Sequence, residues 1–325
     1  MRLWKQKTHS MKTPPKLNDI LTAHERIESY IHRTPVMTCA ALDQMTGASL
    51  FFKCENFQKG GAFKARGAFN AVLSLSNEEA SSGVITHSSG NHAAALAIAA
   101  QVRKIPAYIV MPSTAPAVKK AAVEGYGGKI TFCEPTLTAR IETTQLLIAE
   151  TNAILIHPYD DYRIIAGAAT AALELLEDIP GLDYIFAPVG GGGLVSGTAL
   201  IAHYMNPHIK IVGCEPENAD DAYRSFKEDR LVTIENPKTI ADGLRTMLSD
   251  KTFGIIKKYV DDIITVTEEE IITAMRTVWE RMKIIIEPSS AVAVAPILYG
   301  KLSAPEKRIG IILSGGNVDL KNLPF

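Results

Sequence analysis

The sequence predicts an α/β protein built from two parallel-sheet domains. Short apolar runs, typical of buried strands, alternate with segments of helical periodicity, and this alternation indicates βαβ units. The runs form two series, residues 84–87, 107–111, 129–133 and 153–156, and then residues 184–189, 210–214, 263–266 and 308–313. Polar, glycine-rich turns follow several of these runs, at the strand ends where ligands bind in open α/β sheets.

The two series predict a small domain inserted into a discontinuous large one. Residues 83–158 hold the first series and are expected to form the small domain. Residues 16–82 and 159–325 are expected to form the large domain, with a further strand at residues 50–54. The cleft between the domains is then the expected ligand site. Residues 1–15 are basic and polar and predict a loose tail, not a signal peptide.

Composition narrows the class of protein. The 325 residues are 46% hydrophobic with a net charge of −1, which suits an enzyme of about two domains and argues against a nucleic-acid partner. No apolar run approaches the ~18 residues that a membrane span needs. The four cysteines are scattered without a Cys-x-x-Cys pair, so we expect reduced core residues and a cytoplasmic protein. They are Cys39, Cys54, Cys133 and Cys214.

Lys64 is the strongest candidate for a catalytic residue. It follows Gly60-Gly61-Ala62-Phe63 and opens a segment with a buried helical stripe, so its amine is expected at a helix start that faces the cleft. Partial burial there would lower the lysine pKa and leave the neutral amine that condenses with carbonyl groups. The alternative is an ordinary solvated lysine at a helix start.

Four consecutive glycines, Gly190 to Gly193, follow a strand-like run and precede a helical stretch. Without Cβ atoms the backbone can bring several N–H groups onto phosphate oxygens, and the helix dipole favours the anion. A flexible turn is the alternative.

The turn Ser88-Ser89-Gly90-Asn91-His92 follows the run 84–87 in the same way. Its hydroxyls, amide and helix N–H groups suit a carboxylate, and Asn91 is able to hydrogen-bond a phenolic oxygen on a cofactor ring.

These motifs, together with Ser314-Gly315-Gly316-Asn317, resemble in order and spacing those of fold type II pyridoxal-phosphate (PLP) enzymes, the tryptophan synthase β-like class. The closest match is the serine racemase and serine/threonine dehydratase (ammonia-lyase) group, from about residue 17 to residue 320. The resemblance implies PLP as the cofactor, a Schiff base on Lys64, a small amino-acid substrate and a homodimer. The chain departs from the pattern at Tyr159, where animal racemases carry Asn, and at Ala93-Ala94, where Gly-Gln is common.

The resemblance also implies roles for single residues. Phe63 packs by the ring, Asn91 bonds the ring hydroxyl, Ser314 meets the pyridine nitrogen, and the phosphate is held by Gly190, Gly191, Gly192, Gly193 and Leu194. A serine cannot hold that nitrogen protonated as a carboxylate would, which favours β-elimination. The substrate is bound by Ser88, Ser89, Asn91 and His92. Glu287 lies near the ring edge, or alternatively serves as a helix-start carboxylate.

An acidic segment, Glu215-Pro216-Glu217-Asn218-Ala219-Asp220-Asp221, is similar to the divalent-cation loop of serine racemases. By that similarity the ligands are Glu215, the Ala219 carbonyl and Asp221. Two carboxylates and a carbonyl make a hard oxygen site of the kind that Mg²⁺ or Ca²⁺ prefers, and Mn²⁺ is a further candidate. The alternative is an acidic surface turn that holds no ion.

The expected function is PLP-dependent β-elimination of serine, threonine or threo-3-hydroxyaspartate, with Lys64 removing the Cα proton. Racemisation of serine is the main alternative, and by resemblance its second acid/base is Ser89, which otherwise is a carboxylate-binding hydroxyl. Two remoter alternatives are a nicotinamide-dependent dehydrogenase and a non-catalytic PLP or amino-acid binding protein. No window from Gly190 to Gly197 fits Gly-x-Gly-x-x-Gly, which argues against the dehydrogenase.

Overall fold

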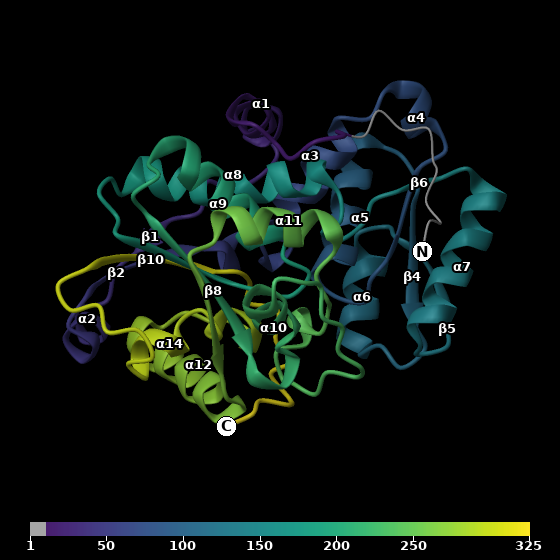
Figure 1. Cartoon of the computed structure of the whole chain (residues 1–325). Helices are drawn as coiled ribbons and strands as arrows, with labels where there is room; N and C mark the ends of the chain where they lie inside the picture. The colour runs from purple at the N-terminus through teal and green to yellow at the C-terminus, as the bar shows by residue number, and fades with distance from the viewer. Residues whose placement is uncertain (1–10) are drawn as a thin grey trace.

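The computed structural model describes residues 11–325 and arranges the strands in two sheets (Figure 1). The larger sheet has the order β1-β2-β10-β7-β8-β9 and the smaller one β5-β4-β3-β6. The strands are β1 Val36–Met37, β2 Ser49–Cys54, β3 Val84–His87, β4 Ala107–Pro112, β5 Lys129–Cys133, β6 Ile154–Leu155, β7 Tyr184–Pro188, β8 Lys210–Pro216, β9 Asp262–Val266 and β10 Arg308–Leu313. Each predicted strand is therefore present, within one or two residues of its expected ends.

One edge of the larger sheet departs from the predicted parallel arrangement. Strand β1 pairs antiparallel with β2, with Val36 opposite Lys53. The other paired strands of both sheets are parallel. A run of two residues carries no visible alternation, so periodicity could not reveal β1.

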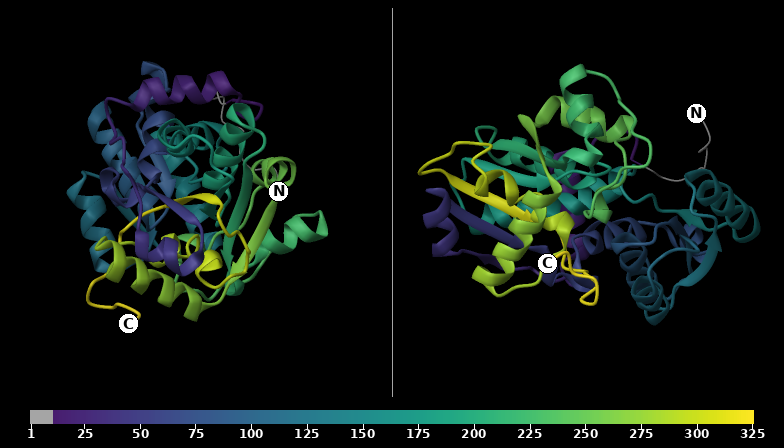
Figure 2. Two further views of the ribbon diagram at one scale, coloured as in Figure 1. Left: turned by 90° about the vertical axis from the view of Figure 1, so that its left-hand side faces the viewer. Right: turned by 90° about the horizontal axis from the view of Figure 1, so that it is seen from below.

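Helices cover both faces of the larger sheet (Figures 1 and 2). The helices are α1 Leu17–Ile27, α2 Ala40–Thr46, α3 Lys64–Leu73, α4 Asn77–Ser81, α5 Asn91–Arg103, α6 Ala117–Gly125, α7 Leu137–Thr151, α8 Tyr162–Asp178, α9 Gly193–Met205, α10 Asp221–Glu228, α11 Asp250–Tyr259, α12 Glu268–Met282, α13 Pro288–Ala291 and α14 Ala295–Leu298. Short 3₁₀ turns are η1 Glu55–Phe57, η2 Lys59–Gly61, η3 Glu217–Ala219 and η4 Asp242–Leu244.

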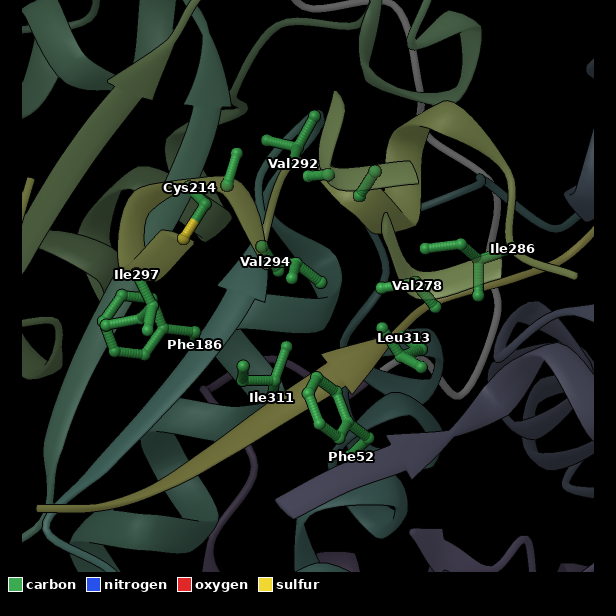
Figure 3. Packing of buried hydrophobic residues seen from close by; sticks show 14 of the residues in the cluster. Phe52, Phe186, Cys214, Val278, Ile286, Val292, Val294, Ile297, Ile311 and Leu313 are labelled. Carbon is green, nitrogen blue, oxygen red and sulfur yellow. The ribbon is translucent and has the colours of Figure 1, made fainter. Parts of the chain in front are cut away.

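Strand alternation divides the core of the larger sheet into two layers. Phe186 and Ile311 face the layer of α12, α13 and α14, which Figure 3 shows from close by. Ile185 and Ala187, the neighbours of Phe186 in β7, face the layer of α8, α9 and α11. The carboxyl ends of the central strands therefore emerge between two packed helical layers, and the polar turns begin there.

The smaller sheet takes all its strands from residues 83–158, and the larger sheet takes none from that range. Helix α3 lies outside the range, but its Phe69 shares an apolar cluster with Leu96 of α5 and Ile109 of β4. The packing thus continues from α3 into the smaller sheet. The domain limit at residue 82 stays a proposal.

A buried ion network fixes the first turn of α3. Arg66 donates to Glu55 Oε2 at 2.7 Å and to Glu174 Oε2 at 2.7 Å, and Lys53 Nζ donates to the same Glu174 oxygen at 2.6 Å. All four side chains are at most 1% exposed. Two cations and two carboxylates balance each other, which is the condition for burying charge in a core. The network lies two residues beyond Lys64 and holds the helix start in place.

Two further expectations can be compared with the structure. Cys54 and Cys214 are buried, whereas Cys39 and Cys133 are only half-buried, so the expectation of core cysteines is wrong for the latter two. All four are free thiols.

No helix within residues 11–325 has the length and apolar character needed to cross a bilayer. Most of the tail expected at residues 1–15 lies outside the described residues.

Candidate active site

The turn before Lys64 requires its glycines. Gly60 and Gly61 have φ of 67° and 71°, in the left-handed region that favours glycine. A Cβ on Gly61 would lie 2.5 Å from Asn317 Oδ1, so the close approach of Asn317 also excludes a side chain at position 61. Helix α3 then begins at Lys64, with Phe63 as its N-cap residue. The predicted position of the lysine at a helix start is what the structure has.

The Lys64 side chain is half-buried, and its amine points into the protein. Nζ donates to the Pro158 carbonyl at 2.9 Å and lies 5.0 Å from the centre of the Phe63 ring. Burial lowers the pKa of Lys64 to about 8, although the Glu287 carboxylate partly opposes this. Lys64 therefore has a larger neutral fraction near pH 7 than an ordinary lysine, as the sequence led us to expect for a carbonyl-condensing amine.

The tetraglycine loop connects β7 to α9 and is enclosed on both sides. A Cβ on Gly191 would come within 2.3 Å of the Tyr159 ring, and one on Gly190 within 3.0 Å of Leu244 Cα. Gly192 has φ of 82° and is the N-cap of α9 without any side-chain cap. The middle of the loop therefore has no room for side chains, and its backbone N–H groups lead into a helix N-terminus suited to an anion such as phosphate. Leu194 follows and is buried.

The turn from Ser88 to His92 joins β3 to α5. Ser88 Oγ accepts from the Gly90 N–H at 3.3 Å, and Gly90, the N-cap of α5, makes no side-chain cap. His92 is buried with Nε2 3.1 Å from the Ile156 carbonyl, so Nε2 carries the hydrogen. Burial and the nearby Lys64 lower the pKa of His92 to about 3, and the ring is neutral. Ser89 is half-buried in this turn.

Hydrogen bonds join Asn91, at the start of α5, to Glu287, at the start of α13. Asn91 Nδ2 donates to the two Glu287 carboxylate oxygens at 2.9 and 3.1 Å, and Asn91 Oδ1 accepts from Asn317 Nδ2 at 3.0 Å. Asn317 Nδ2 also donates to the Gly60 carbonyl at 2.7 Å. Burial raises the pKa of Glu287 to about 7, against the lowering effect of the Asn91 bonds. Glu287 is the N-cap residue of α13, as the helix-start alternative expects, but its carboxylate makes no side-chain cap there.

Ser314, immediately after β10, lies beside the lysine turn. Its carbonyl accepts from the Phe63 N–H at 2.9 Å, and the next residue, Gly315, forms an isolated bridge with Ala62. Ser314 is 3% exposed. The segments that carry Lys64 and Ser314 are thus locked together, although 250 residues separate them in the sequence.

The acidic loop lies at the end of β8. Glu215 accepts from the N–H groups of Ala222 and Tyr223 at 3.1 and 2.8 Å, and Asp221 Oδ2 accepts from Leu248 N–H at 3.0 Å. Ala219 is the buried last residue of the turn η3 between them, whereas Glu217 and Asn218 of that turn are exposed. Burial and the neighbouring Asp221 raise the pKa of Glu215 well above its ordinary value, and burial raises that of Asp221 to about 7.

The structure brings most predicted residues together and adds others. Direct contacts or adjoining turns link four of them, Lys64, Asn91, Glu287 and Ser314. The acidic loop forms a separate cluster on β8 and α10. Sequence reasoning did not single out the Pro158 carbonyl or Ser290, and it quoted Asn317 only as part of a motif. Ser290 directly follows Glu287-Pro288-Ser289, so only its place in that turn could have drawn attention to it.

A half-buried lysine amine at a helix start and a glycine loop that leads into a helix N-terminus, in a fold of two mainly parallel sheets, are the features of fold type II PLP enzymes. The family model of pyridoxal-phosphate dependent enzymes matches residues 27–315. Serine racemase from Dictyostelium discoideum is 52% identical over 94% of this chain and 96% of its own length. The β-hydroxyaspartate dehydratase from Paracoccus denitrificans is 50% identical over 96% of this chain and 99% of its own length. The structure of maize serine racemase superposes with a TM-score of 0.93 at 46% identity over 94% of each chain.

The chain therefore belongs to the family of pyridoxal-phosphate dependent enzymes. The predicted fold class and the prediction of an enzyme of the lyase and racemase type are confirmed. Membership of this family also decides against a nicotinamide-dependent dehydrogenase.

Proposed function

We propose that the protein catalyses PLP-dependent α,β-elimination of a small β-hydroxy amino acid to a keto acid and ammonia. Serine is the first candidate substrate, with L-threonine and threo-3-hydroxyaspartate next. The observation that carries the proposal is the Lys64 amine, which has a pKa of about 8 and lies near the Glu287 and Asn91 pair. The names of relatives include both a β-hydroxyaspartate dehydratase and serine racemases, which supports elimination and racemisation alike.

The residues of this chain fit the cofactor. Gly191 and Gly192 have no room for a Cβ, and Gly190 and Gly193 have only tight room. The uncapped start of α9 offers N–H groups for the phosphate. Phe63 would pack by the ring. One hydrogen of the Asn91 amide goes to Glu287, which leaves the second for the ring hydroxyl. Ser314 would meet the pyridine nitrogen, and Lys64 would hold the cofactor until the substrate amine replaces it.

Bound PLP supplies an electron sink for negative charge at the substrate Cα. Lys64, once released, takes the Cα proton as a general base. The substrate carboxylate is held by Ser88, Ser89, Asn91 and the start of α5. His92 contributes its backbone N–H, because its ring hydrogen-bonds the Ile156 carbonyl. Loss of the β-hydroxyl with a proton releases water, and the enamine left behind hydrolyses to the keto acid and ammonia.

Racemisation of serine is the second candidate function, because Ser89 lies in the same turn as the carboxylate-binding groups. A base on one face and an acid on the other are both needed to invert Cα. Ser89 would fill the second role opposite Lys64.

The direct test is keto-acid release from a panel of β-hydroxy amino acids by the purified holoenzyme. We expect turnover with L-serine, L-threonine or L-threo-3-hydroxyaspartate, and chiral chromatography of the remaining serine measures racemisation. A holoenzyme that binds PLP but releases no keto acid from any of these would rule out elimination. It would favour the non-catalytic binding protein if serine is also left unracemised.

We also propose a divalent cation, Mg²⁺ or alternatively Ca²⁺ or Mn²⁺, at Glu215, Ala219 and Asp221. Two carboxyl groups whose pKa values are raised by burial are costly to ionise together without a cation. Within residues 11–325 no cluster of three or more His, Cys, Asp or Glu side chains is present that could hold a metal. Two carboxylates and a backbone carbonyl, completed by water, would still make a hard oxygen site.

Mg²⁺ is expected to raise the melting temperature, and more strongly at pH 8 than at pH 6. The folded pKa of Asp221 is raised to about 7, so its contribution to stability is present at low pH and is lost as pH rises through that value. A cation bound to the ionised pair offsets this loss. An ion bound only to the folded state at a hundredfold excess over its Kd adds roughly 2.7 kcal/mol. Melting curves with Mg²⁺ and with EDTA at the two pH values measure the effect.

The matched variants are Asp221→Asn and Asp220→Asn. Asp221→Asn keeps an acceptor for the Leu248 N–H but removes the charge, and the Mg²⁺ response should disappear. Asp220 pairs with Arg224 on the half-exposed side of the loop, so its variant should keep the response. Identical curves for the unaltered protein with Mg²⁺ and with EDTA at both pH values would count against a site.

A homodimer in the cytoplasm, which the family resemblance implies, stays a proposal. Light scattering of the purified holoenzyme tests the oligomeric state, and fractionation of the source cells tests the compartment.

A further inference from the structure

The turn between β6 and α8, residues 157–161, begins with a histidine that bonds the backbone of its own turn. His157 Nδ1 accepts from the Asp160 N–H at 2.9 Å and from the Tyr159 N–H at 3.4 Å. Asn and Asp side chains fix Asx turns in the same way, by accepting backbone N–H groups a few residues further on. Pro158, enclosed by these bonds, has a restricted φ of its own. The His157 side chain therefore fixes the direction of the Pro158 carbonyl.

The Pro158 carbonyl points at the expected general base. It accepts from Lys64 Nζ at 2.9 Å. The lysine amine stands at the end of a flexible four-carbon stem, and a hydrogen bond to a fixed carbonyl selects one of its many positions. A neutral amine has two hydrogens and one lone pair. Donation to Pro158 uses a hydrogen and leaves the lone pair free to take a proton.

His157 stays an acceptor because its ring is neutral. The ring makes edge-on contacts with the rings of His87 and Tyr159, with centres 5.5 and 4.6 Å away. Burial lowers the pKa of His157 well below its ordinary value of 6.5, and neighbouring groups that carry or can take a positive charge add to the effect: His87, His92, Lys251 and Lys64. The hydrogen of the ring is therefore on Nε2, and Nδ1 keeps its lone pair for the backbone.

Other parts of the large sheet's surroundings hold the same turn. Lys251 Nζ, in α11, donates to the Asp160 carbonyl at 2.8 Å. The Tyr159 ring lies against the tetraglycine loop, where it would be 2.3 Å from a Cβ on Gly191. Asp161, the last residue of the turn, is the N-cap of α8. The carbonyl that accepts from the lysine thus has a fixed place relative to the loop expected to hold the cofactor phosphate.

We propose that His157 is a positioning residue: by holding the turn 157–161 it presents the Pro158 carbonyl as the docking point of the released Lys64 amine. In the structure the amine is free and makes this contact, as it would once the substrate amine has replaced it on the cofactor. While Lys64 holds the cofactor, its nitrogen is engaged there. His157 should therefore matter after release and not before. The proposal rests on the proposed role of Lys64 as the base.

The test is exchange of the substrate Cα hydrogen with ²H₂O by the purified holoenzyme, followed by proton NMR. L-serine is the first probe, and L-alanine, which has no β-leaving group, shows exchange alone. His157→Ala should lower the exchange rate at saturation by about 10–100-fold, since a displacement of about 1 Å can cost about 10²-fold. KM and the visible absorbance of lysine-bound PLP should stay unaltered, because neither depends on the position of the free amine.

Two further variants and a control keep the result specific to the hydrogen bonds. His157→Asn should restore most of the rate, because an Asn oxygen accepts the same N–H groups and Asn-Pro favours a turn. His157→Ser accepts more weakly, so its rate should be intermediate, and it replaces the alanine variant if that one does not fold. His87→Asn is the matched control, because it removes the ring that packs on His157 and leaves both bonds of the turn in place. It should keep the unaltered rate.

Crystal structures of the variants without PLP give a measurement that does not depend on turnover. In His157→Ala, Lys64 Nζ should leave hydrogen-bond distance of the Pro158 carbonyl, whereas in His157→Asn it should stay. An unaltered exchange rate in His157→Ala, or a Lys64 amine still bonded to Pro158 there, would overturn the role of His157. If the unaltered holoenzyme binds PLP but exchanges no Cα hydrogen, the proposed role of Lys64 is wrong and His157 has no base to position.

Discussion

Lys64→Ala is expected to lose turnover by at least about 10²–10⁴-fold, the range for a general acid or base, together with the visible absorbance of lysine-bound PLP. By the proposed mechanism, the variant lacks both the amine that would hold the cofactor and the base that would take the Cα proton. Lys53 is also buried, but its ammonium is paired with Glu174 and cannot substitute. Absorbance spectra and keto-acid release on the purified variant measure the two losses.

Lys59→Ala is the matched control for this prediction. Lys59 is half-buried in η2 of the same turn, five residues before Lys64, and no catalytic role is assigned to it. Its variant should keep the absorbance of the bound cofactor. An unchanged spectrum in Lys64→Ala would show that another group holds the cofactor.

Periodicity predicted the strands well because buried parallel strands are continuous apolar runs. The run 308–313 is observed as β10 with the same ends, and 129–133 as β5. Periodicity could not predict that nearly every side of helix α3 is buried. The apolar stripe of α3 predicted one buried face, but Arg66 and Asn70 are buried as well because they bond to groups distant in sequence. Such pairings depend on the tertiary fold.

The candidate site was predictable where glycine or lysine was needed for a local reason. The tetraglycine loop is an example, because its backbone is enclosed by Tyr159 and Leu244. The partners of the polar groups were not predictable. Glu287 accepts from Asn91, and the Pro158 carbonyl accepts from Lys64, through contacts between segments roughly a hundred or more residues apart. Nothing in the local sequence of Glu287 distinguishes this role from that of a helix cap.

Ser89 offers the sharpest separation of the two proposed activities. If Ser89 supplies the proton on the face opposite Lys64, only reactions that involve that face depend on it. L-to-D interconversion and elimination from a D-amino acid then need Ser89, whereas Lys64 can start elimination from the L-enantiomer alone. In the proposed site the hydroxyl would also help to hold the substrate carboxylate, so some loss of L-elimination through binding is expected, on the order of 1–3 kcal/mol.

Ser89→Ala should therefore abolish D-directed activity, by about 10²–10⁴-fold, and weaken L-elimination mainly through KM. Keto-acid release and chiral chromatography on L- and D-serine, for the unaltered and the altered protein, measure both. Ser88→Ala is the matched control, since the Ser88 hydroxyl accepts from the Gly90 N–H and supports the turn for both enantiomers. It should lower the two activities together. An unaltered enzyme that makes no D-serine would contradict racemisation, and equal losses in Ser89→Ala would make Ser89 a binding residue and not a face-specific base.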